Sequence, residues 1–219
     1  MAEGVLFAGP SACGLPPALL AGCGLELRPP ARRGDLARLV DEAAPAQRVL
    51  VLCDGVFQSA PAVSHAEICL ALDRGWAVWG VSSLGAIRAH EMRAEGMRGW
   101  GWVYAQFARH ADFTDDELCL LHLPEPPWLP LTEALVDVRH ALARQGAALG
   151  IAPAARRVVV AELRKLWFGE RSAERLHEIL CGAAGVDAAT AGRFLAGLAL
   201  RRVKSLDLQS LLQRRPWAG

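Results

Sequence analysis

Lysine is nearly missing from the sequence. Lys165 and Lys204 are the only lysines among 219 residues, so almost all basic residues are arginines. Acidic and basic residues balance to a formal net charge of +1, which gives no indication of binding to nucleic acid or to a membrane surface. No apolar stretch approaches the roughly 20 residues that cross a bilayer. With 53% apolar residues, the chain is expected to be a soluble globular protein with one substantial core and room for a smaller unit.

The cysteines lack the patterns of metal sites and redox sites. The six cysteines lie far apart, no C-x-x-C pair occurs, and no cysteine–histidine cluster has zinc-ligand spacing. Several lie in apolar runs, where a free thiol packs as a small hydrophobe. Residues 1–4 include an acid and lead directly into a strand-like segment, unlike a signal peptide. We therefore expect a cytoplasmic protein with reduced cysteines and no bound metal.

Short apolar runs alternate with amphipathic segments in the first half of the chain. The runs at 5–8, 49–53 and 77–81 predict buried strands, and the segments at 35–42 and 61–73 predict helices. This alternation predicts an α/β fold with a small, mainly parallel sheet and flanking helices. From about Ile151 onward the patterns are helical throughout. We therefore expect an α/β core over 1–150, and a helical segment over 151–219 that packs on the core or docks a partner.

Polar segments follow the three predicted strands, at 9–11, 54–58 and 82–83. Parallel sheets bind ligands beyond the carboxyl ends of their strands, so Ser11, Asp54 and Ser83 are expected to converge if the strands are neighbours. The first segment has the glycine spacing of a phosphate loop but lacks the following Lys-Ser/Thr. No G-x-G-x-x-G follows a strand either. The sequence therefore predicts no nucleotide cofactor.

Ser83 stands where a strand is expected to turn into a helix. Serine is a common helix cap, so capping is the ordinary interpretation of this position. A hydroxyl there can also serve as a nucleophile, with the backbone N–H groups of Leu84 and Gly85 holding an oxyanion. Ser83-x-Gly85 is half of the G-x-S-x-G nucleophile elbow, with Val81 in place of the first glycine.

A serine nucleophile needs a base. Each candidate also has an ordinary interpretation, because Asp-Gly is typical of turns and single helical histidines are mostly structural. The candidates are Asp54, His65, Glu67 and His90.

Three arginines are candidates for binding an anionic group. Arg32 and Arg33, beside Gly34, could hold a carboxylate or could be surface charges. Arg88 lies three residues before Glu91, so the two can pair on one helix face.

Six ordered blocks resemble the TfuA-like family. They span residue 5 to about 140, roughly two thirds of the chain, and comprise 6–11, 28–35, 54–57, 80–92, 96–101 and 130–136. The resemblance implies a partner of YcaO enzymes in peptide backbone thioamidation, in which sulfur replaces an amide oxygen. It also implies release of sulfur from the C-terminal thiocarboxylate of a ThiS-like carrier, and help in binding the precursor peptide.

The resemblance further implies a hydrolase-like site in which a serine acts with a lysine. The family serine corresponds to Ser83. The family lysine stands in a His-Lys-Glu-Ile block, which here reads His65-Ala66-Glu67-Ile68. The serine is therefore present and the lysine is replaced by alanine.

Two hypotheses follow, with a third below them. In the first, Ser83 attacks the thiocarboxylate carbon, and His65 or solvent takes the proton. In the second, the chain is a non-catalytic adaptor that brings the YcaO enzyme, carrier and precursor peptide together and acts through effective concentration. The third alternative is an unrelated small α/β serine hydrolase.

Overall fold

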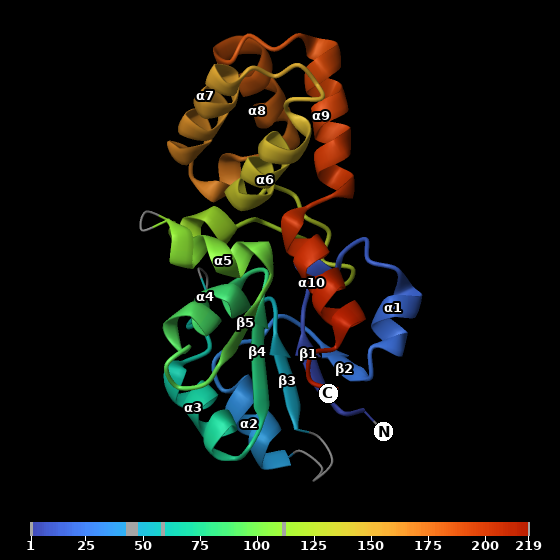
Figure 1. Cartoon of the computed structure of the whole chain (residues 1–219), viewed down its shortest axis with the longest axis vertical. Coiled ribbons are helices and arrows are strands. Elements are labelled where there is room, and N and C mark those ends of the chain that lie inside the picture. The colour runs from blue at the N-terminus through green and yellow to red at the C-terminus, as the bar shows by residue number, and fades with distance from the viewer. Residues whose placement is uncertain (1, 43–47, 58–59, 111–112, 219) are drawn as a thin grey trace. The chain divides into compact units, whose positions relative to one another are not determined.

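The computed structural model describes residues 2–42, 48–57, 60–110 and 113–218, and these form two compact units (Figure 1). The first, called the α/β unit below, comprises Met1–Phe113 and Lys204–Gly219, and the second, the helical unit, comprises Thr114–Val203. The change in sequence pattern near Ile151 does not coincide with this division. The helical unit begins well before it, and the final helix belongs with the sheet.

The α/β unit is built on a five-stranded sheet in which every neighbouring pair is parallel. The order is β2-β1-β3-β4-β5, with β1 at Gly4–Phe7, β2 at Leu25–Arg28, β3 at Val49–Leu52, β4 at Ala77–Val81 and β5 at Arg98–Trp100. The predicted α/β class is confirmed, and the three predicted strands are β1, β3 and β4. The apolar pattern did not indicate β2, which carries charged residues, or β5, which has three residues and contains Gly99.

Helices cover both faces of this sheet. On one face, α1 (Pro17–Gly22) and α10 (Val203–Arg214) pack on the strands, and Leu208, Leu211 and Leu212 of α10 share a core with Leu6 and Val51. The other face carries α2 (Asp35–Glu42), α3 (His65–Asp73) and α4 (Leu84–Glu91) (Figure 1). Side chains alternate between the two faces of each strand, so both faces of the short central strands are buried.

Two glycines allow α4 to lie directly on the strands. A Cβ at Gly80 would lie 2.0 Å from the carbonyl oxygen of Gly85, and a Cβ at Gly85 would lie 1.7 Å from that of Leu52. Any larger residue would push the helix away from β3 and β4.

The helix α10 is bound to the α/β unit by polar contacts as well. The Asp207 carboxylate accepts hydrogen bonds from the backbone N–H groups of Trp102 at 2.9 Å and Val103 at 2.8 Å, at the start of α5 (Gly101–Arg109). Just beyond α10, Trp217 packs edge-on against Trp79, with ring centroids 6.4 Å apart. The α/β unit therefore combines segments from both ends of the sequence.

The helical unit has its own core, in which Leu135, Leu142, Val159, Leu176 and Phe194 are buried together. Its helices are α6 (Leu135–Gln145), α7 (Pro153–Arg164), α8 (Ala173–Glu178) and α9 (Ala188–Leu200), with short turns η2 (Asp115–Leu118), η3 (Phe168–Glu170) and η4 (Ile179–Ala183). In neither unit does any described helix have the length and apolar character needed to cross a membrane.

Candidate active site

The strand β4 ends in a sharp turn centred on Ser82. The φ angle of Ser82 is 65°, and the N–H of Ser83 donates to the carbonyl of Val81 at 2.8 Å, which closes a γ-turn. Such a turn with positive φ is rare and strained for a residue that has a side chain. The fully buried Ser82 hydroxyl donates to the backbone carbonyl of Lys204 at 2.6 Å and so helps to hold the turn. In hydrolases the nucleophilic serine itself sits on such a strained strand–turn–helix junction. In this chain the residue with positive φ is Ser82, and Ser83 is the residue that follows it.

Ser83 follows this turn at the N-cap position of α4. Its side chain makes no capping hydrogen bond to the helix. Ser83 is 5% exposed, whereas Ser82 is sealed. Its hydroxyl is therefore not used for helix capping, although the sequence made capping the ordinary interpretation.

The expected oxyanion site is only partly available. The N–H of Gly85 donates to the carbonyl of Cys53 at 3.1 Å, and the N–H of Ser83 is used in the γ-turn. Leu84, the first residue of α4, has no backbone acceptor for its N–H among the described residues. The Gly85 N–H thus ties α4 to the end of β3, because the missing side chain lets the helix approach so closely.

Asp54 and Ser11 meet at the carboxyl ends of β3 and β1, as expected. One carboxylate oxygen of Asp54 accepts from the backbone N–H groups of Gly9 at 2.8 Å and Ser11 at 2.9 Å, and the other accepts from the Ser11 hydroxyl at 2.7 Å. Both residues are buried. The strand order reverses direction here, between β1 and β3, where doubly wound sheets bind ligands. Asp54 fixes the loop after β1, and both of its carboxylate oxygens are used in the hydrogen bonds that do so.

Cys53 and Lys204 add two further buried polar groups at this edge of the sheet. Burial raises the pKa of the Cys53 thiol well above its ordinary value, the Asp54 charge raises it further, and the Ser82 and Ser11 hydroxyls and the Lys204 charge oppose this rise. The thiol therefore stays protonated and is a poor nucleophile. Lys204 is 2% exposed, and its charge acts on Cys53. Sequence reasoning did not select Lys204, and the only available signal was the scarcity of lysine.

His65 lies on the surface at the start of α3. Its Nε2 atom is 2.8 Å from a carboxylate oxygen of Glu91, which also accepts from Arg88. Burial acts to raise the pKa of Glu91, but the hydrogen bonds from His65 and Arg88 outweigh it and lower the pKa below its ordinary value. The predicted pairing of Arg88 with Glu91 is present. The contact of His65 is with Glu91 and not with Ser83, so its expected role as the base has no support from this arrangement.

Glu67 holds the start of α3 in place. It forms a capping box with Ser64, and its second oxygen accepts from the backbone N–H of Gly34 at 2.7 Å. Arg33 donates through Nε to a backbone carbonyl at 3.1 Å, and the side chains of Arg32 and Arg33 are exposed. These residues therefore join the loop after β2 to α3.

Gln58, in the polar segment after β3, lies outside the described residues.

The parallel sheet, with a strained serine turn and buried polar residues at its carboxyl edge, defines an α/β protein of doubly wound type with a candidate ligand site at the strand ends. A family model described as TfuA-like protein matches residues 54–172, more than half of the chain. The chain belongs to the TfuA-like family, which confirms the resemblance. The match includes His65 and Ser83 and leaves out Ser11, Arg32 and Lys204. No curated protein matches the chain.

Proposed function

We propose that this protein serves YcaO-dependent thioamidation of a peptide backbone by releasing sulfur from the thiocarboxylated tail of a ThiS-like carrier at Ser83. The observation that carries the proposal is the Ser83 hydroxyl, which follows a strained turn at the carboxyl edge of the sheet and makes no capping bond. Membership of the TfuA-like family supports the pathway. A carrier, a precursor peptide and a YcaO enzyme are then the expected partners.

The proposed reaction has two steps. The Ser83 oxygen attacks the thiocarboxylate carbon, a C–O bond forms, the C–S bond breaks, and sulfur leaves as hydrosulfide with the hydroxyl proton. Water then cleaves the resulting ester, which returns the hydroxyl to Ser83 and leaves the carrier with a carboxylate and one released proton. The Leu84 N–H is placed at the helix start, where it can donate to the developing oxyanion.

The source of base catalysis differs from the family pattern. The family lysine position is Ala66, which is exposed, and His65 pairs with Glu91. Loss of a general base costs about 10²–10⁴ in rate, yet hydrosulfide is a far better leaving group than an alkoxide. We propose that solvent accepts the proton in the second step and that the Lys204 charge favours the negative transition state. With 5% of Ser83 exposed, carrier binding must open this edge locally.

The adaptor function is the second candidate, and two contacts favour it. The Gly85 N–H is occupied by the Cys53 carbonyl, and His65 is held by Glu91, so two expected catalytic groups have other partners. An adaptor would bind the same partners without breaking the C–S bond.

Sulfide release from a purified thiocarboxylated ThiS-like carrier separates the two functions. We expect release well above the uncatalysed rate with the wild-type protein and background release with Ser83→Ala. Ser210→Ala, on α10, is the matched control and should keep wild-type activity. Equal release by wild type and Ser83→Ala would rule out the hydrolase and leave only the adaptor function. The adaptor function would then be tested by measuring the affinity of both proteins for the carrier. Ala66→Lys should raise turnover if the family lysine position is correctly placed.

A further inference from the structure

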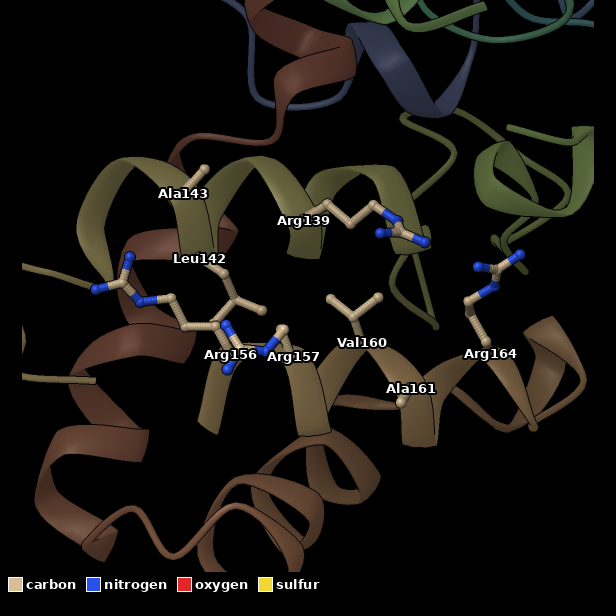
Figure 2. A pocket seen from close by; sticks show the side chains of 8 residues that line it. All are labelled: Arg139, Leu142, Ala143, Arg156, Arg157, Val160, Ala161 and Arg164. Carbon is tan, nitrogen blue, oxygen red and sulfur yellow. The ribbon is translucent and has the colours of Figure 1, made fainter. Parts of the chain in front are cut away.

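A groove of about 380 Å³ lies between α6 and α7 of the helical unit (Figure 2). Its volume falls in the range of ligand-binding pockets. Apolar side chains from both helices form its floor, and arginines surround it. The residues that matter below are Leu142 and Val160 on the floor, and Arg139, Arg156, Arg157 and Arg164 around it.

Arg139 and Arg156 are held in place by hydrogen bonds to other groups of the helical unit. Arg139 forms a two-point hydrogen-bonded pair with Glu117, at 2.8 Å and 2.7 Å. Arg156 donates through Nε to the backbone carbonyl of Ile151 at 2.7 Å. A carbonyl carries no net charge, so the positive charge of Arg156 remains, and its terminal nitrogens keep donors for a carboxylate. Fixed guanidinium groups lose less entropy when a ligand binds.

The groove concentrates positive charge in a chain that is close to neutral overall. From Arg139 to Lys165 the sequence contains six basic residues and one acidic residue, Glu162. Glu162 pairs with Lys165 at 2.6 Å, and no described residue that lines the groove is acidic. The apolar side chains on the floor and the arginines around the groove together favour a ligand that has both apolar and acidic groups.

We propose that this groove binds an acidic amphipathic peptide segment, whose apolar side chains cover Val160 and Ala161 and whose carboxylates meet the arginines. A groove between two helices that accepts the apolar face of a peptide is a common recognition mode. A small inorganic anion would leave Val160 and Ala161 exposed to water, so the apolar part of the groove would contribute nothing to its binding. The inference goes beyond the sulfur chemistry and does not depend on Ser83.

The test uses the full chain and a labelled helical peptide with leucines at i, i+3, i+4 spacing and glutamates on the flanks. Fluorescence anisotropy should show binding that weakens as salt is added. The same peptide with each glutamate replaced by lysine should bind about tenfold more weakly or worse, a difference of about 1.4 kcal/mol. Equal affinity for the two peptides would overturn the proposal.

Substitutions in and outside the groove test whether the peptide binds there. Arg157→Glu should weaken binding about tenfold, whereas Arg201→Glu, an equal charge change at an exposed site outside the groove, should change it less than about twofold. Ala161→Trp fills the groove at an exposed position without changing charge, and it should also weaken binding. Circular dichroism checks that each variant is folded. Unchanged binding by Arg157→Glu or by Ala161→Trp, or full displacement by inorganic phosphate, would overturn the proposed occupant.

Discussion

The two units of this protein differ in how charged residues are arranged at their candidate sites. The α/β unit buries Asp54 and Lys204 at the sheet edge, whereas the helical unit places four of its ten arginines around an open groove. A buried charge requires fixed partners, as the three hydrogen bonds to Asp54 illustrate. At the groove, Arg157 is exposed, so an incoming ligand can reach its guanidinium group. The first arrangement therefore suits chemistry at a defined point, and the second suits docking of a partner.

The close packing of α4 on the sheet should make the α/β unit intolerant of even one added methyl group at Gly85. We expect Gly85→Ala to lower the free energy of unfolding by about 3 kcal/mol or more, because the new methyl group would meet the backbone of Leu52. Gly192→Ala on α9 is the matched change in the helical unit, where no atom lies within 4 Å. It should gain about 0.5–1 kcal/mol from helix propensity. Urea unfolding measures both, and a shared sign would refute the contrast.

Removal of a buried carboxylate should cost more than removal of an exposed one. Asp54→Asn replaces an acceptor with an NH₂ group that faces N–H or O–H donors, so we expect a loss of about 2–3 kcal/mol. Asp187→Asn, at the exposed N-cap of α9, should cost only a few tenths of a kcal/mol because asparagine caps equally well. Thermal unfolding of the two variants tests this, and similar losses would contradict it.

The two lysines should differ in their effect on sulfide release. Lys204→Met is expected to lower release about tenfold, because the buried charge at the sheet edge would no longer stabilise a negative transition state. Lys165→Met changes an exposed lysine paired with Glu162 and should leave release unchanged. The thiocarboxylated-carrier assay compares them, with unfolding curves to show that both proteins are folded. Equal rates would remove Lys204 from the proposed chemistry.

The smallest expected effect is the change with pH in the contribution of Glu91 to the stability of the protein. Its pKa is lower in the folded state than in the unfolded chain, so ionised Glu91 stabilises the protein above the unfolded pKa of about 4.3. This contribution is lost as pH falls through the lowered pKa. The urea midpoints of wild type and Glu91→Gln should therefore differ near neutral pH and converge in stronger acid. Glu178→Gln, which breaks an exposed pair with Arg175 in the helical unit, should change the midpoint little at any pH.

The sequence predicts the parts of the fold that depend on local pattern. The continuous apolar runs of β1, β3 and β4 identify buried strands, and Asp187 marks the start of α9 by capping it. The apolar pattern did not indicate β2, because its charged residues are those of an edge strand.

The site was only partly predictable, because its details depend on long-range contacts. The position of Ser83 follows from the local sequence, but the strained turn at Ser82 and the occupied N–H of Gly85 do not. Lys204 reaches the sheet edge from a helix more than a hundred residues away in sequence, and no local pattern shows which elements α10 packs against. His65 was selected by residue type, and its pairing with Glu91 depends on how α3 meets α4.

The place of α10 has a consequence for synthesis of the protein. The helical unit is one continuous segment, so a ribosome delivers all of it before α10 emerges. Until then one face of the sheet lacks Leu208, Leu211 and Leu212, and the carbonyl that receives the Ser82 hydroxyl has not been made. During synthesis the sheet of the α/β unit therefore stays partly uncovered, at a stage when the helical unit already has every residue that it needs to fold.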